Sequence, residues 1–183
     1  VYEAALERIA YCFQEFDNVL VAFSGGKDSG VLLNLCYNYA DEHGLLDKLT
    51  MYHLDYEAQY QMTTEYVTRT FLEQFPGIRK MWYCVPIKAQ SACALGEPYW
   101  TPWDAAKKKL WVRAMPENPY VVHEGNLDVP FRHGMVDYEF QDKLSRHFAK
   151  KRGTTAVMVG LRADESLNRY AAVARGKKRR SYE

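Results

Sequence analysis

Short, continuous apolar runs recur along the chain and predict buried strands. The run at 19–23 holds five apolar residues without alternation. It is too short for a helix and rich in β-branched and aromatic residues, which is typical of a parallel strand buried on both faces. Similar runs at 49–54, 81–85 and 156–159 predict three further strands.

Between these runs, apolar residues follow helical spacing. Residues 2–16 place Leu6, Ile9 and Phe13 on one face, which predicts an amphipathic helix. Strands that alternate with helices predict an α/β fold with a parallel sheet and right-handed crossovers. The further helices are expected from about 27–30 to near 44, from 63 or 64 to about 74, from 137 to a cap at 153, and from near 166 onward.

Residues 86–135 interrupt this alternation. Prolines recur through the segment, and 104–115 is its one window with helical spacing. A stretch of this length without periodicity is typical of a functional lid. Its aromatic residues are expected to form a small separate core, although they could stack on a base, and its basic residues are expected to form a solvated helix face. These residues are Tyr99, Trp100, Trp103 and Trp111, and Lys107, Lys108, Lys109 and Arg113.

Composition and charge narrow the class of protein. The chain has 183 residues, of which 48% are hydrophobic, and this predicts a single domain over 1–183 with a real core. No apolar run is long enough for a membrane span, so we expect a cytoplasmic protein without a membrane partner. The net charge of +1 excludes a globally basic nucleic-acid binder. Only the basic run from Arg175 to Arg180 could contact nucleic acid, and such terminal runs are usually solvated.

The segment Ser24-Gly25-Gly26-Lys27-Asp28-Ser29 follows the first predicted strand and opens the next helix. The two glycines allow a sharp turn and a close approach to a ligand, and the start of the helix favours an anion. A Walker A loop is excluded, because Asp28 stands where that motif needs a hydroxyl. A nucleophile elbow is disfavoured, because its first glycine is missing, His147 is the last histidine that could act as the base, and no glycine-rich oxyanion loop precedes the serine. The segment predicts a phosphate-binding loop.

Two other turns also stand at the expected carboxyl edge of the sheet, where ligands bind in open α/β folds. After the second strand, Asp55 is expected to face the nucleotide or its metal, with Glu57 as a second candidate, whereas His53 is expected to be a core residue. After the fourth strand, Gly160 begins a turn that should lie close to the phosphate loop. Arg162 and Arg169 in and after this turn are suited to bidentate contact with phosphate or sulfate oxygens.

Ser24 to Ser29 matches the S-G-G-x-D-S signature of the PP-loop ATP pyrophosphatases at every fixed position. Together with V-G-L-R-A-D-E-S-x-x-R near the end, it resembles the phosphoadenosine phosphosulfate (PAPS) reductase branch of that superfamily. The segment H-L-D-Y-E-A-Q-Y-Q-M-T-T-E-Y and the Trp-rich middle resemble a bacterial and phage subgroup of PAPS sulfotransferase-like proteins. That subgroup includes co-activators of the immunoglobulin-binding regulator A type.

The resemblance implies a Rossmann-like adenine nucleotide alpha hydrolase fold, with helices on both faces of a mostly parallel five-stranded sheet in the order 3-2-1-4-5. It implies that ATP or PAPS lies across the carboxyl edges, and that Lys27, Asp28 and Arg162 take part in catalysis. Asp28 would bind Mg²⁺, and Arg162 and Arg169 would hold the anionic end of the substrate. The residues implied to contact the nucleotide and its phosphates are Ser24, Gly25, Gly26, Lys27, Asp28, Ser29, Asp55 and Gly160.

The chain departs from the PAPS reductases in its cysteines. It lacks the E-C-G-I-H-like tail that carries their nucleophile, and Cys93 is the one plausible substitute among its four cysteines. Thiol-dependent reduction is therefore disfavoured. Two classes of function stay open: an enzyme that cleaves ATP to AMP and pyrophosphate, or acts on PAPS, with an unknown acceptor; and a regulator that binds nucleotide and a protein partner without turnover.

Overall fold

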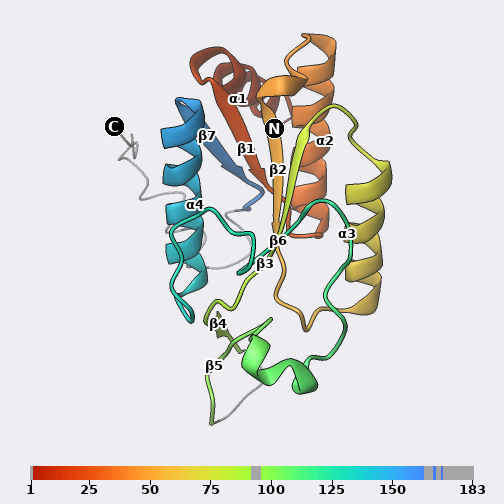
Figure 1. The fold of residues 1–183 in the computed structure, drawn as a ribbon. Helices are drawn as coiled ribbons and strands as arrows, with labels where there is room; N and C mark the ends of the chain where they lie inside the picture. The colour runs from red at the N-terminus through yellow and green to blue at the C-terminus, as the bar shows by residue number, and fades with distance from the viewer. Residues whose placement is uncertain (1, 92–95, 163–166, 168–169, 171–183) are drawn as a thin grey trace.

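A parallel sheet forms the centre of the protein. The computed structural model describes residues 2–91, 96–162, 167 and 170. The strands of the sheet are β1 (Asn18–Ala22), β2 (Leu49–Leu54), β3 (Arg79–Cys84), β6 (Val121–His123) and β7 (Thr155–Val159). They lie in the order β6-β3-β2-β1-β7, and every neighbouring pair is parallel (Figure 1).

Helices cover both faces of this sheet. α1 (Tyr2–Glu15), α2 (Lys27–Glu42) and α3 (Gln61–Glu73) lie on one face, and α4 (Asp137–Arg152) lies on the other (Figure 1). Successive residues of β1 point to opposite faces. Val19 and Val21 pack with the three helices, whereas Leu20 packs with α4. Burial on both faces explains why the strands are continuous apolar runs.

The four predicted strands and the helices predicted before β7 outside segment 86–135 are confirmed, with small shifts at their ends. β3 begins at Arg79 and α3 begins at Gln61, each two residues or more before the predicted start. The helix expected to start near Ser166 falls on residues outside those described. Among the described helices, none is long and apolar enough to cross a membrane.

The first part of the segment 86–135, described over 86–91 and 96–111, lies beyond the carboxyl ends of the central strands (Figure 1). It holds a small antiparallel pair, β4 (Ala89–Gln90) and β5 (Tyr99–Trp100). The helix expected over 104–115 is wrong: a 3₁₀ helix, η2 (Ala105–Leu110), stands there, with a kink at Lys107. Short 3₁₀ turns are common in connecting segments. Outside this segment, another 3₁₀ helix, η1 (Leu46–Lys48), precedes β2.

The strand order confirms the expected sequence 3-2-1-4, which corresponds to β3-β2-β1-β7. The fifth strand of the described sheet lies beside β3, and the strand expected after β7 would fall outside the described residues. This fifth strand is β6, which pairs with β3 at the opposite edge of the sheet and comes from within the segment predicted to be irregular. The described residues contain no strand on the outer side of β7. Three residues are too few to give a clear apolar run, so β6 left no signal in the sequence.

Candidate functional site

The loop between β1 and α2 turns sharply at the carboxyl edge of the sheet. At its start, the amide N–H of Phe23 donates a hydrogen bond of 2.8 Å to the carbonyl of Tyr52 in β2. Gly25 follows with φ of +81°, and a Cβ there would stand 2.7 Å from Cγ2 of Val67 in α3. A glycine is therefore required both by the backbone conformation and by the close approach of α3.

Two serines close the loop into a small ring. The hydroxyl of Ser29, which is 5% exposed, donates to the carbonyl of Gly26 at 2.9 Å. Because that hydrogen is used, Ser24 must donate in the 2.9 Å bond between the two hydroxyls. The backbone N–H of Ser24 also donates to Oγ of Ser29 at 3.2 Å. The ring holds the loop in its turned conformation before any ligand binds.

The start of α2 offers amide groups to an anion. Gly26 is the N-cap residue, and no side chain caps the helix there. The first amide N–H groups of a helix have no partner within the helix, and they lie at the positive end of its dipole. Lys27 adds a cationic side chain in the exposed part of this turn. The arrangement suits a phosphate or sulfate group.

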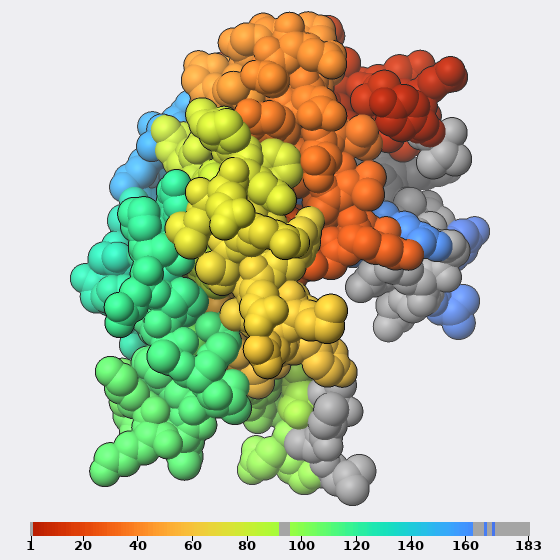
Figure 2. All heavy atoms as spheres, turned by 90° about the vertical axis from the view of Figure 1, so that its right-hand side faces the viewer, coloured from red at the N-terminus to blue at the C-terminus, as the bar shows by residue number. Residues whose placement is uncertain are grey.

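The turn after β7 lies against this loop, as the sequence predicted. A Cβ on Gly160 would stand 2.9 Å from the carbonyl carbon of Asp28 in the first turn of α2. Figure 2 shows the late residues of the chain, in blue, beside the orange atoms of α2. Asp28, Gly160 and Arg162 line one end of a cavity of about 400 Å³ that continues between α1 and α2. Arg169 lies outside the described residues.

Asp55 lies elsewhere than expected, because its carboxylate is buried inside the protein with partners of its own. It is 0% exposed, and Oδ1 and Oδ2 stand 2.6 and 2.7 Å from Nη2 of Arg113. The indole N–H of Trp82 donates to Oδ2 at 2.7 Å, and the amide of Glu57 donates to Oδ1 at 2.7 Å. Asp55 therefore anchors the segment 86–135 to the end of β2 and does not face the edge of the sheet.

Glu57 also anchors the segment 86–135 to the end of β2. Its side chain is 4% exposed, and its carboxylate accepts the amides of Trp103 at 2.8 Å and Val112 at 2.9 Å. Its carbonyl accepts from Nε of Arg113 at 2.9 Å. Trp103 is buried in the main core and contacts Trp111, so the expectation of a separate aromatic core is wrong for Trp103.

Arg113 is the residue that the sequence analysis missed. The sequence predicts that Arg113 forms a solvated helix face together with Lys107, Lys108 and Lys109, but no α-helix forms there. Its guanidinium instead pairs with Asp55 and lies 4.9 Å from the ring of Trp103. No local signal in the sequence indicates this pairing, because Asp55 and Arg113 are 58 residues apart and the burial of Asp55 appears only in the structure.

An open hollow adjoins the loop on the side of β2. It has a volume of about 630 Å³ and is lined by Ala58, Gln59, Tyr60, Thr63 and Val112. Thr63 reaches the loop itself, because its Cγ2 would be 3.0 Å from a Cβ on Gly25. This hollow offers room for a ligand whose phosphates lie on the loop.

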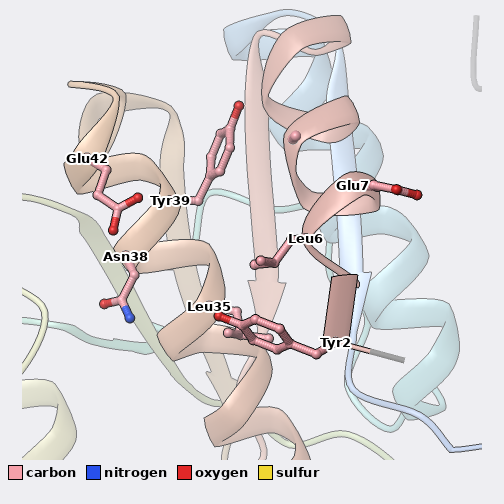
Figure 3. A pocket seen from close by; sticks show the side chains of 8 residues that line it. Tyr2, Leu6, Glu7, Leu35, Asn38, Tyr39 and Glu42 are labelled. Carbon is pink, nitrogen blue, oxygen red and sulfur yellow. The ribbon is translucent and has the colours of Figure 1, made fainter. Parts of the chain in front are cut away.

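Another pocket lies apart from the loop. It has a volume of about 390 Å³ between α1 and α2, and in Figure 3 Tyr2 and Leu6 of α1 stand beside Leu35 of α2. Asn38 and Glu42 line its other side (Figure 3). Since none of its lining residues belongs to 24–29, this pocket is not part of the candidate site.

The chemical groups at the site limit the reactions open to it. The described residues contain no cluster of three or more histidine, cysteine or acidic side chains that could hold a metal. Asp28 could contribute a carboxylate to a magnesium site, since Mg²⁺ is commonly held by one or two carboxylates together with substrate phosphates. Burial raises the pKa of Cys36 to about 12 and raises the pKa of Cys84 further above its usual range. Neither thiol is a nucleophile. Cys93 lies outside the described residues.

Comparison with known proteins agrees with this geometry. Residues 18–180 match the family model described as the phosphoadenosine phosphosulfate reductase domain. The chain is also 32% identical, over 182 residues, to the uncharacterized protein YbdN of Escherichia coli (strain K12). That alignment covers 98% of this chain and 43% of the relative, so the chain spans less than half the length of the relative that it matches.

Proposed function

This chain belongs to the phosphoadenosine phosphosulfate reductase domain family, and from that premise we propose that it binds ATP or PAPS at the carboxyl edge of its sheet. The phosphates lie on the loop 24–29, and the rest of the nucleotide extends toward the hollow beside Thr63 and Gln59. Arg162 and Arg169 hold the anionic end of the substrate. Asp28 contributes to Mg²⁺ binding together with the phosphates.

One observation supports this proposal above the others. The loop is closed by the Ser24–Ser29 hydroxyl pair and held between α3 at Gly25 and the turn after β7 at Gly160. A loop fixed in this way loses little conformational freedom when a ligand binds, so its amides are already arranged for an anion. The family match covers the same loop and the turn after β7.

Calorimetry with ATP and with PAPS tests the binding. The double variant Ser24→Ala/Asp28→Ala should lose nucleotide binding, because it opens the hydroxyl ring and removes the magnesium-binding carboxylate. Asp142→Ala/Ser145→Ala is a matched control, since it removes the same residue types from α4 on the opposite face. It should bind nucleotide as the wild type does. Unchanged affinity in the first variant would refute the assignment of the loop.

For ATP, the proposed reaction is attack on the α-phosphorus. An acceptor oxygen forms the new bond to phosphorus, the bond to the bridging oxygen breaks, and pyrophosphate leaves with that electron pair. The loop amides and Lys27 stabilise the charge that develops on the leaving group. Mg²⁺, when bound, neutralises phosphate charge. Arg162 positions the acceptor on the opposite side of the α-phosphorus.

Nucleotide chromatography over a set of candidate acceptors tests this reaction. We expect pyrophosphate together with AMP, which is free where water attacks the α-phosphorus and joined to the acceptor where another oxygen attacks, and loss of both products in Asp28→Ala. Magnesium-dependent formation of ADP that disappears in Asp28→Ala would refute cleavage between the α and β phosphates. Tight binding without product for any acceptor would favour the second function, a nucleotide-binding regulator like the co-activators that the sequence resembles.

A further inference from the structure

A buried histidine lies directly behind the phosphate loop. His53, in β2, is 0% exposed and is surrounded by the rings of Phe23, Phe71 and Trp82. Its Nδ1 stands 2.8 Å from the carbonyl oxygen of Phe23. The paired register of β1 with β2 ends at Ala22, one residue earlier. The side chain of His53 therefore continues the connection between the two strands where the backbone ladder stops.

This contact determines which nitrogen carries the hydrogen. A carbonyl oxygen can only accept a hydrogen bond, so Nδ1 of His53 must be the donor. Burial lowers the pKa of His53, so the ring is neutral near neutral pH. The charged groups that act on this ring are Asp55 of β2, which raises its pKa, and Arg113 of segment 86–135, which lowers it. In the neutral ring Nε2 then has a lone pair and needs a donor.

Gln59 is the side chain that can supply this donor. Nε2 of His53 and Oε1 of Gln59 are both buried, and neither has a hydrogen-bond partner in the orientation that the amide has in the structure. Gln59 nevertheless interacts with His53 closely enough to affect its pKa. Rotating the amide by half a turn exchanges its oxygen and nitrogen, and gives Nε2 of His53 a donor.

We infer that His53 is a positioning residue for the phosphate loop, held as the neutral tautomer in which Nδ1–H donates to the carbonyl of Phe23 and Nε2 accepts from the amide of Gln59. The Phe23–Ser24 peptide is then fixed at both ends: its carbonyl by His53, and its N–H by Oγ of Ser29 at 3.2 Å. Gln59 also lines the hollow beside the loop. The inference rests on the proposed role of the loop in binding phosphate.

Long-range ¹H–¹⁵N correlation of the imidazole tests the tautomer in the wild-type protein, with or without nucleotide. For His53 we expect the ¹⁵N signal of Nδ1 to have the chemical shift of a protonated ring nitrogen. The ¹⁵N signal of Nε2 should have the chemical shift of an unprotonated nitrogen that accepts a hydrogen bond. A neutral ring with hydrogen on Nε2, or a doubly protonated ring near neutral pH, would overturn the inference.

Two substitutions separate positioning from simple core packing. His53→Asn places an amide N–H close to the position that Nδ1 of the imidazole occupies. His53→Gln places an amide N–H close to the position of Nε2. His53→Asn should keep the nucleotide Kd within about threefold of the wild type, and His53→Gln should raise it about tenfold or more, because a buried carbonyl loses its donor. Phe71→Leu removes volume beside His53 without removing a loop hydrogen bond. It should lower Tm and leave the Kd within about threefold.

Amide hydrogen exchange at Ser24 gives a readout that does not need nucleotide. Exchange should be slow in the wild type and in His53→Asn, and faster in His53→Gln. Equal exchange and equal Kd in the two variants would overturn the positioning role. A wild type that binds no nucleotide would refute the proposed function, while the tautomer and the exchange at Ser24 would still decide the role of His53. The tautomer measurement uses the wild-type protein alone, so it would still test the inference if a variant failed to fold.

Discussion

A single buried carboxylate, Asp55, fixes the segment 86–135 to the sheet. A charge with no access to water is very unfavourable unless it is paired and hydrogen-bonded. Asp55 meets this requirement through Arg113, the indole of Trp82 and the amide of Glu57. Arg113 is itself largely buried, with a side chain 21% exposed. Removing Arg113 alone would leave an unpaired charge in the interior.

We therefore expect Arg113→Met to lower the free energy of unfolding by about 3 kcal/mol, as for other buried ion pairs that lose one partner. Adding Asp55→Asn should recover part of this loss, because the remaining buried group is then neutral. Urea denaturation measures both effects. Lys143→Ala, which breaks an exposed pair with Glu139, is the control and should cost less than about 0.5 kcal/mol. An equal cost in Arg113→Met and Lys143→Ala would contradict this account.

Three elements approach the loop 24–29 closely. α3 contacts it at Gly25, the end of β7 contacts the start of α2 at Gly160, and β2 holds it at Phe23. Gly25 combines a positive φ with contact to α3, whereas Gly44, at φ of +66°, has no neighbouring atom within 4 Å of a would-be Cβ. A comparison of alanine substitutions at the two positions therefore separates the cost of backbone strain from the cost of steric crowding.

Gly44→Ala should cost only the strain of a left-handed residue, about 1 kcal/mol. Gly25→Ala should cost about 1–3 kcal/mol more, because its methyl group would press on Val67 and Thr63 and displace the loop from α3. Nucleotide affinity should fall in Gly25→Ala and stay unchanged in Gly44→Ala. Chemical denaturation and calorimetry on both variants check this. Equal stability of the two would show that α3 does not constrain the loop.

Across the whole molecule, segments far apart in the sequence are joined where α1 meets β1 and α4 meets β7. The carboxylate of Asp17 accepts the amide of Thr154 at 2.8 Å and its hydroxyl at 2.7 Å. The amide of Asp17 in turn donates to Thr154 Oγ1 at 3.1 Å. These hydrogen bonds hold the pKa of Asp17 below its usual value. They join the two ends of the described fold beside the paired strands β1 and β7.

This pKa makes the stability depend on pH in a defined direction. The pKa of an aspartate in the unfolded chain is about 4. A carboxyl whose pKa is lower in the folded state stabilises that state when the pH is above the unfolded pKa. This stabilisation is lost as the pH falls through the folded pKa. Thr154→Val should therefore be less stable than the wild type near neutral pH, and the difference should shrink on acidification. Urea midpoints over a pH series measure it. Thr155→Val, which leaves Asp17 bonded, should show no such dependence on pH, and a constant difference for Thr154→Val would contradict the assignment.

The sequence by itself determined the elements whose signal is local. Continuous apolar runs located β1, β2, β3 and β7, and helical spacing located the helices between them. The turn at 24–29 was also located from the sequence. Its glycines, hydroxyl groups and charged side chains all lie within six consecutive residues. Each of these signals depends on neighbours in the chain, so no knowledge of the tertiary structure was needed.

Only the tertiary structure decided which distant groups meet. Arg113 and Asp55 are 58 residues apart, and nothing near Arg113 in the sequence distinguishes it from a solvated cation. β6 is too short for a periodic pattern and joins the sheet because β3 offers it an open edge. His53 has an ordinary core position in the sequence, and its contact with the Phe23 carbonyl appears only when β1 and β2 pair. Long-range pairing is set by packing and by the cost of burying unpaired polar groups, and neither quantity is written in the local sequence.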